Sequence, residues 1–419
     1  MQFCPRRHGV EQLHARPDNS RNIVPASAMT INKRQRLMCS PSFERPGHPT
    51  RGTRTAASAR GYPAPMPWIE NEPVRGGYPD IGFLGLPGNT RMRAGLDGYM
   101  LPPPIYHLMG LKIVEAGDGS STFSMPASPW LAGNSGLFLA GVSALAADAP
   151  LGGAILSKVP AGVYGATSEL SMNFMRPATV QSERLTARAT VIETGRSLGL
   201  SHATVTDARN SVLAHATSRY FLTTLPEIPA VGDRVHVEPP VYATPDPHMR
   251  PLDDDPARDR WMSMSGLEYF QAVIKGDMPA APFARLFGMT LQEAESGRVT
   301  ASIPAVEWLC SPARTIYGGL IAFFADAMMT AAVGTTLPAG SSSATLDLKV
   351  QYLRPGFADG RALTCRGEVV HRGRTLAVAR AEILNADGKA LALATGSTMI
   401  LEGRPWRAVA VADESAPED

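Results

Sequence analysis

Cysteine is scarce in this sequence, and several familiar motifs are missing from it. The 419-residue chain has four cysteines, none in a CxxC pair or near a histidine at zinc-finger spacing. Neither a disulfide framework nor a structural zinc site is therefore expected. The chain also lacks the apolar stretch of a secretory signal, a P-loop, a dinucleotide fingerprint and a Ser/His/Asp nucleophile elbow. These absences predict a cytoplasmic protein that needs no metal or redox cofactor.

Net charge is low overall but uneven along the chain. The formal charge is +2, whereas residues 1–60 contain 11 Lys/Arg against three Asp/Glu. The rest of the chain is therefore mildly acidic and has no general attraction for nucleic acid. We predict that residues 1–60 form a disordered basic leader, and we expect neither nucleic acid nor a membrane as a partner.

An internal repeat organises the sequence. Residues 104–218 align on residues 282–396 without a gap, and about a third of the aligned positions are identical. The identical positions include the pairs Trp130/Trp308 and Asp148/Asp326. The chain therefore contains two copies of one domain.

Composition around the two copies predicts where the domains begin and end. Residues 226–256 carry eight prolines and an acidic run, which is typical of an extended, partly stiff linker. The predicted segments are a leader over 1–60, an irregular Pro/Gly-rich extension over 61–87, domain 1 over 88–224, a Pro-rich acidic linker over 225–264, domain 2 over 265–403 and a disordered tail over 404–419.

Both copies predict the same order of elements. In the second copy a short helix near 266–275 precedes a two-stranded hairpin, an apolar helix over 317–333 and four further strands separated by Gly- and Asn/Asp-rich turns. The long helix is apolar on nearly every face, yet it is too short for a membrane span and carries an aspartate in its middle. We expect an α+β fold in which an antiparallel sheet curls around this buried helix.

An acidic residue in each long helix is the strongest candidate for chemistry. Asp148 and Asp326 lie in otherwise apolar helices, and an ionised carboxylate is costly to bury unless it is paired. Each aspartate either braces the helix against a neighbouring backbone or acts as a general base or nucleophile with a pKa raised by burial. Gly318 and Gly319 begin the second helix, where glycine lets a substrate oxygen approach the free amide groups.

These residues resemble a known family. Tyr317-Gly318-Gly319, the helical Asp326, the strand TLDLKVQYLRP and the hairpin VVHRGRTLAVARAEI are similar to those of hotdog-fold acyl-CoA thioesterases of the phenylacetate-degradation (PaaI) type. The resemblance covers most of 282–401 and, more weakly, about 104–222. The family pattern has an Asn, then His-Gly-Gly, then the Asp. Here Ser311 and Tyr317 stand at the Asn and His positions; the first copy has Leu139-Ala140-Gly141, with Asn134 near the Asn position.

The resemblance implies two fused hotdog domains that pair within one chain and leave the possibility of further association between chains. Each site would combine the helix N-terminal amides of one domain with the aspartate of the other and a hydroxyl residue on the following strand. One site would contain Gly318, Gly319, Asp148 and Thr167, and the other Ala140, Gly141, Asp326 and Thr345. The first has the more complete glycine loop and is slightly favoured. Tyr317 or Ser311 could add a polar contact to substrate there.

The resemblance further implies an enzyme that hydrolyses an acyl-CoA thioester. Arg196 and Arg374 lie in matching turns and could hold the phosphates of coenzyme A, although charged turns on a surface are more common. Two alternatives stay open: a non-catalytic acyl-CoA-binding protein, and an enoyl-CoA hydratase or dehydratase. The second usually needs a histidine with its acid, and no histidine position is shared by the two copies.

Overall fold

The computed structural model describes residues 72–252 and 256–403. The predicted leader over 1–60 and tail over 404–419 lie outside these residues. None of the described helices is both long enough and apolar enough to cross a membrane.

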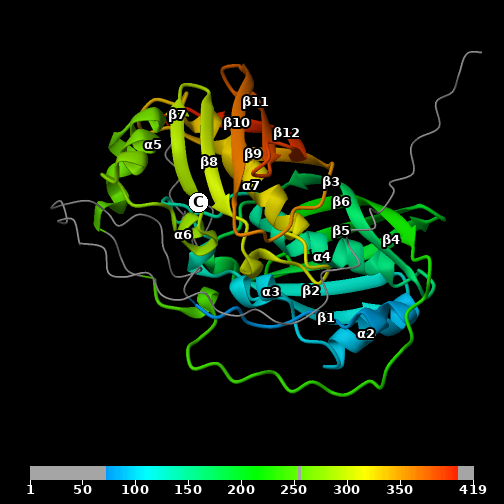
Figure 1. The fold of residues 1–419 in the computed structure, drawn as a ribbon. Helices are drawn as coiled ribbons and strands as arrows, with labels where there is room; N and C mark the ends of the chain where they lie inside the picture. Colours follow the sequence, from blue (N-terminus) through cyan, green and yellow to red (C-terminus); the bar gives the residue numbers. More distant parts are fainter. Residues whose placement is uncertain (1–71, 253–255, 404–419) are drawn as a thin grey trace, which may run out of the picture. The chain divides into compact units, whose positions relative to one another are not determined.

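The described strands form one 12-stranded sheet in which all neighbouring strands are antiparallel (Figure 1). The sheet order is β1-β2-β4-β5-β6-β3-β9-β12-β11-β10-β8-β7, so the second half repeats the first in reverse. The strand bounds are β1 Lys112–Gly117, β2 Ser120–Pro126, β3 Val163–Phe174, β4 Arg184–Thr194, β5 Leu198–Thr206, β6 Val212–Thr224, β7 Thr290–Glu295, β8 Arg298–Pro304, β9 Ser342–Tyr352, β10 Ala362–Arg372, β11 Leu376–Leu384 and β12 Ala390–Leu401.

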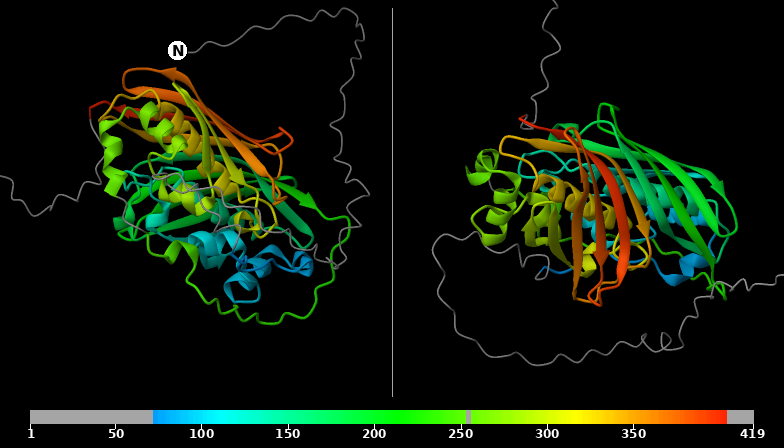
Figure 2. Two further views of the ribbon diagram at one scale, coloured as in Figure 1. Left: turned by 60° about the vertical axis from the view of Figure 1, so that its left-hand side comes forward. Right: turned by 90° about the horizontal axis from the view of Figure 1, so that it is seen from above.

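Each half of the sheet curves around one long helix, as Figures 1 and 2 show. The α-helices are α2 Gly88–Leu96, α3 Pro104–Met109, α4 Val142–Leu156, α5 Gly266–Lys275, α6 Pro282–Phe287 and α7 Gly318–Gly334. Short 3-10 helices are η2 Ile81–Gly85, η3 Pro129–Leu131, η4 Val180–Ser182, η5 Pro247–Met249, η6 Pro256–Ser263 and η7 Glu307–Leu309. The predicted order of helix, hairpin, long helix and four strands is confirmed in both copies.

The two halves are related by a pseudo-twofold axis that passes between β3 and β9. Their register pairs Ser171 with Lys349, and Lys349 is also the residue that aligns with Ser171 in the repeat. Glu169 pairs with Gln351 and Asn173 with Asp347, which is the same arrangement read from either strand. The chain therefore builds within itself the continuous sheet that the resemblance implied for a domain pair.

The long helices α4 and α7 are the centre of the hydrophobic core. Their side chains are buried on nearly every face, and the two helices contact each other. In the first copy the matching long helix, α4, begins at Val142, because Ala140 and Gly141 before it form a turn, and it continues through Pro150. The repeated tryptophans Trp130 and Trp308 are both buried.

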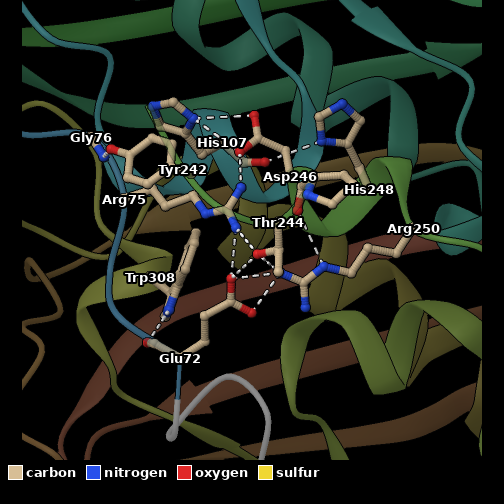
Figure 3. Close-up of polar contacts among 11 residues, drawn as sticks. Glu72, Arg75, Gly76, His107, Tyr242, Thr244, Asp246, His248, Arg250 and Trp308 are labelled. Carbon is tan, nitrogen blue, oxygen red and sulfur yellow. Dashed lines mark hydrogen bonds and ion pairs between the residues drawn. The ribbon is translucent and has the colours of Figure 1, made fainter. Parts of the chain in front are cut away.

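Residues 242–250, which we call the strap, pack against the folded body although they lie within the predicted linker. Figure 3 shows the strap residues Thr244, Asp246 and Arg250 among the side chains of Glu72 and Arg75. The guanidinium of Arg75 lies 2.7 Å from both Glu72 and Asp246, and Arg250 lies 2.5 Å from Glu72. The Arg75 side chain is only 3% exposed, so these charges are paired in a largely buried setting.

Candidate active site

Asp326 is held by groups from both domains. Its Oδ2 accepts a hydrogen bond of 2.7 Å from the Gly141 amide, at the N-terminal end of α4 in the other domain. Its Oδ1 accepts from the Thr345 hydroxyl of β9 at 2.7 Å and from the Thr330 hydroxyl at 3.5 Å. The Asp326 carboxylate is fully buried, yet at least three of its four lone-pair positions accept a hydrogen bond.

Asp148 has the equivalent environment on the other side of the pseudo-twofold axis. Its Oδ2 accepts from the Gly319 amide at 2.9 Å, and its Oδ1 accepts from the Thr167 hydroxyl at 2.9 Å. The structure thus brings together the residues that the sequence grouped into each of two sites. Their roles in catalysis stay predictions.

The glycines of the two loops are needed because the facing helices approach so closely. A Cβ on Gly318 would lie 2.8 Å from Asp148 Oδ2, and one on Gly319 would lie 2.7 Å from the Ala144 carbonyl oxygen. A Cβ on Gly141 would lie 2.9 Å from the Cβ of Asp326. A side chain at any of these positions would push the amide away from the carboxylate.

Burial shifts the titration of both aspartates in the same direction. Burial raises the pKa of Asp148 to about 6, against the opposing hydrogen bonds from Thr167 and Gly319. Burial also raises the pKa of Asp326, against the hydrogen bonds from Gly141, Thr345 and Thr330. A carboxyl with a raised pKa can exchange a proton near neutral pH, as a general base must.

Four tyrosines surround Asp148. Burial, and after it the charge of Asp148, raises the pKa of every one of them: Tyr106, Tyr220, Tyr317 and Tyr352. The rings of Tyr106 and Tyr317 lie edge to face with centroids 6.4 Å apart. Gly152 leaves room for Tyr220, since a Cβ there would lie 2.9 Å from the tyrosine hydroxyl. Aromatic side chains therefore lie close to Asp148.

The equivalent positions around Asp326 carry no tyrosine. In the gapless alignment of the two copies, Tyr106, Tyr220, Tyr317 and Tyr352 correspond to Ala284, Thr398, Leu139 and Phe174. A cavity of about 650 Å³ lies on this side, and Ala284, Leu139 and Phe174 are among the residues that line it. The hydroxyl residues Thr330 and Thr345 also line it, which brings the cavity to the residues that hold Asp326.

The cavity lies on the opposite side from the one that the sequence slightly favoured, which was the Asp148 side. The sequence favoured that side for its two glycines, but the cavity lies beside Asp326. The loop at Ala140 and Gly141 nevertheless keeps its backbone donors. Ala140 lines the cavity, and its amide has no hydrogen-bond partner among the described residues. It lies next to the amide that orients Asp326, near the N-terminus of α4, where unpaired amides favour negative charge.

Tyr317 has a structural contact where the sequence suggested contact with a substrate. Its hydroxyl donates to the Leu145 carbonyl at 2.9 Å and accepts from the Ala149 amide at 3.0 Å. These are two backbone groups that a regular α-helix would join to each other. The hydroxyl is thus engaged in α4 at the turn that precedes Pro150.

Ser311 and Asn134, two further predicted binding residues, lie in different settings. Ser311 forms a local turn, in which its hydroxyl contacts Thr315 at 3.2 Å and accepts from the Ala313 amide. Asn134 lines the cavity and donates at 2.5 Å to the Tyr269 hydroxyl of α5 and at 3.1 Å to the Pro279 carbonyl. Among the described residues, no hydrogen bond joins Ser311 to either aspartate. Asn134 joins the loop of one domain to the other domain.

Arg196 and Arg374 lie in exposed hairpin turns, as their sequence context indicated. Neither of them lines the cavity. Their predicted contact with phosphate stays a prediction. Sequence reasoning missed the four tyrosines around Asp148. A signal for them was available, because a comparison of the two aligned copies shows that each tyrosine is replaced by another residue type in the other copy.

Comparison with known proteins identifies the family. The model of the thioesterase superfamily matches twice, at residues 136–214 and 313–392, once in each half of the chain. Human acyl-coenzyme A thioesterase 13 is 30% identical over 122 residues, which are 29% of this chain and 86% of that protein. Escherichia coli acyl-coenzyme A thioesterase PaaI is 28% identical over 121 residues, which are 29% of this chain and 83% of PaaI.

Several solved structures span about 70% of this chain. The tesB protein of Mycobacterium avium subspecies paratuberculosis superposes with a TM-score of 0.44 and 16% identity, covering 71% of this chain and 98% of that one. The two family matches and the covered relative show that the chain belongs to the thioesterase superfamily, with two hotdog domains in one polypeptide. It is thus placed among thioester hydrolases.

Proposed function

We propose that the protein hydrolyses an acyl-CoA thioester to a free acid and coenzyme A at the Asp326 side of the domain pair. The observation that carries this proposal is the juxtaposition of a cavity, an Ala140 amide without a hydrogen-bond partner among the described residues, and a buried carboxylate held by Gly141 and Thr345. The names of the curated relatives supply the substrate class, since two of them are acyl-coenzyme A thioesterases.

In this proposal the thioester carbonyl oxygen accepts a hydrogen bond from the Ala140 amide. That amide and the N-terminal end of α4 stabilise the negative charge that develops on the oxygen during attack. The Asp326 carboxylate takes a proton from a water molecule, which adds to the carbonyl carbon. The tetrahedral intermediate then collapses as its carbon–sulfur bond breaks, and the proton held by Asp326 passes to the departing coenzyme A thiolate, which leaves as the thiol. Attack by Asp326 itself, through a mixed anhydride, is the alternative route.

The remaining groups orient the carboxylate. Thr345 and Thr330 donate to Oδ1 of Asp326, and Gly141 donates to Oδ2, so the carboxylate has a fixed direction before substrate binds. This chemistry uses a carboxylate and backbone amides, and it calls for no metal or redox cofactor. Asp148 has similar hydrogen bonds but lies among tyrosines, so we assign to it a role in joining the domains.

Two matched variants test this assignment. Asp326→Asn keeps the size of the side chain but removes the base, so kcat/KM should fall by a factor of about 10² to 10⁴. Asp148→Asn, the equivalent change on the filled side, should keep kcat/KM within about threefold of the parent. Steady-state hydrolysis of a panel of acyl-CoA thioesters measures both. If Asp148→Asn alone removed activity, the assignment to the Asp326 side would be wrong; if the double variant remained fully active, neither aspartate would be catalytic.

A further inference from the structure

The cavity beside Asp326 extends from the candidate reaction centre to the inner face of α5. Thr345 and Ala140 line one part of it, and the α5 side chains Phe270 and Val273 line another. Helix α5 is held in place at both ends. Ser265 and Glu268 form a capping box at its start, and Gly276 ends it with a positive φ of 76°. The helix is therefore a fixed wall of the cavity.

A contact between the domains also fixes this wall. The Asn134 side chain, on the loop that precedes Ala140, donates to the hydroxyl of Tyr269 in α5 and to the carbonyl of Pro279 beyond it. Asn134 and Tyr269 both line the cavity. The loop that carries the proposed oxyanion amide and the helix that covers the cavity are thus tied together, so the distance between the reaction centre and the far wall is defined.

The lining of this wall is apolar. Phe270 and Val273 of α5, Phe283 and Ala284 of α6, and Met328 and Ala331 of α7 face the cavity. Hydroxyl groups that line the cavity beside Asp326 come from Thr330 and Thr345. Polar side chains such as Asn134, Arg176 and Lys275 line other parts of the cavity. The apolar side chains beneath α5 offer space for a hydrocarbon chain whose thioester would lie near Thr330 and Thr345.

We propose that this cavity is the acyl site and that it selects straight apolar acyl chains of medium to long length over acetyl and phenylacetyl groups. The proposal rests on the thioesterase function proposed above. The cavity has a volume of about 650 Å³. If each heavy-atom group takes the ~30 Å³ share of a water molecule, the cavity holds on the order of twenty such groups, which is enough for a medium to long acyl chain together with the thioester end.

The residue that sets the depth of this site is Ala284. Its equivalent in the first domain is Tyr106, whose ring packs against Phe123 and Tyr317 beside the filled Asp148. The same fold therefore accepts a tyrosine at this position of α3 and an alanine at the matching position of α6. The smaller side chain leaves space that a hydrocarbon can fill.

The first experiment measures kcat/KM of the full-length protein for acetyl-, butyryl-, octanoyl-, dodecanoyl-, hexadecanoyl- and phenylacetyl-CoA. Each buried methylene should raise kcat/KM roughly threefold to fourfold until the cavity is full, with a plateau or decline beyond it. Highest activity on acetyl- or phenylacetyl-CoA would overturn the proposed chain selection while leaving the thioesterase function intact. No hydrolysis of any of the six would instead refute the proposed function.

The second experiment transfers the tyrosine from the filled side to the open side. Ala284→Tyr should lower the ratio of dodecanoyl to butyryl activity by about tenfold or more, because the ring occupies the space of several methylenes. Ala284→Leu, a smaller change, should lower the ratio less and keeps the test usable if the tyrosine disturbs folding. Tyr106→Ala is the matched control on the other side, and its chain-length ratio should equal that of the parent. An unchanged ratio in folded Ala284 variants, or an equal change in Tyr106→Ala, would overturn the assignment.

Discussion

Asp148 and Asp326 show how the same residue at equivalent positions acquires different surroundings. Both accept a backbone amide across the domain interface and a threonine hydroxyl from their own domain. What differs is the next layer of side chains, in which tyrosines around Asp148 are replaced by smaller or non-hydroxyl residues around Asp326. The cavity reaches the threonines that hold Asp326, and for this reason the function proposed above assigns the chemistry to Asp326 and not to Asp148.

The raised pKa of Asp148 predicts a specific dependence of stability on pH. Because burial raises its pKa from 3.8 to about 6, the folded protein binds this proton more tightly than the unfolded chain does. The stabilisation from this group is therefore fully present below the unfolded value and is lost as the pH rises through the folded value. The difference corresponds to about 3 kcal/mol.

Asp148→Asn removes this titration, so the variant should gain stability relative to the parent as the pH rises from about 4 to about 7. Urea unfolding at several pH values measures the difference in unfolding free energy between the two proteins. Asp326 titrates in the same direction in both, so it cancels from that difference. A difference that stays constant, or that moves the opposite way, would show that Asp148 is charged at little cost in the folded protein.

At the scale of elements, α4 depends on a side chain from the other domain. Pro150 has no amide proton, and its ring crowds the carbonyl one turn before it. One residue earlier, the Tyr317 hydroxyl donates to the Leu145 carbonyl and accepts from the Ala149 amide. The tyrosine at the family's histidine position has therefore become part of the structure of the facing helix.

Removing this hydroxyl should destabilise the protein without touching the Asp326 side. Tyr317→Phe leaves two buried backbone groups without their partner, so the unfolding free energy should fall by about 1–3 kcal/mol. Tyr352→Phe is a useful control, because its hydroxyl donates a single bond, to the Gly318 carbonyl. Urea unfolding at constant pH measures both. A Tyr317→Phe variant as stable as the parent would mean that α4 closes its own hydrogen bond when the hydroxyl is gone.

Much of this element order could be predicted because local signals and the repeat agreed. The helix predicted near 266–275 matches α5, where Ser265 begins it and Gly276 ends it. The grouping of Asp326 with Gly141 and Thr345 followed from the family resemblance. The location of the cavity could not be predicted in this way. It depends on how side chains from α6, β3 and the loop before α4 pack together, which the sequence does not reveal. The strap was missed because proline-rich composition does not reveal which side chains a linker contacts.

At the scale of the whole molecule, the two segments that precede the domains meet at the pseudo-twofold axis. Glu72 and Arg250 are equivalent positions when the alignment of the two copies is extended toward the N-terminus, and each is followed by a proline. The indole of Trp308 donates to the Glu72 carbonyl, whereas the indole of Trp130 donates to the Arg250 carbonyl. Each segment therefore contacts the tryptophan of the other domain, and the side chains of Glu72 and Arg250 pair with each other (Figure 3).

This ion pair is one that a single repeated domain could not make. In a symmetric homodimer a residue near the axis faces its own copy, and like charges there repel. Fusion of the two copies allows glutamate on one side and arginine on the other. Glu72→Arg should therefore lower the unfolding free energy by about 3 kcal/mol, because it leaves Arg75 and Arg250 facing a third cation in a largely buried cluster. Adding Arg250→Glu should restore about 1–3 kcal/mol by re-forming the pair with reversed charges.

The control for this reversal is Glu368→Arg, which breaks pairs with the well-exposed Arg298 and Arg380. It should lower the unfolding free energy much less than Glu72→Arg does, since water screens exposed pairs. Thermal and urea unfolding of the two single reversals at the axis, their double variant and the control measure these differences. If the losses of Glu72→Arg and Arg250→Glu simply added, the two residues would not be coupled. If both single reversals lose stability and the double variant regains it, then opposite charges at Glu72 and Arg250 help to fix how the two domains pair within the chain.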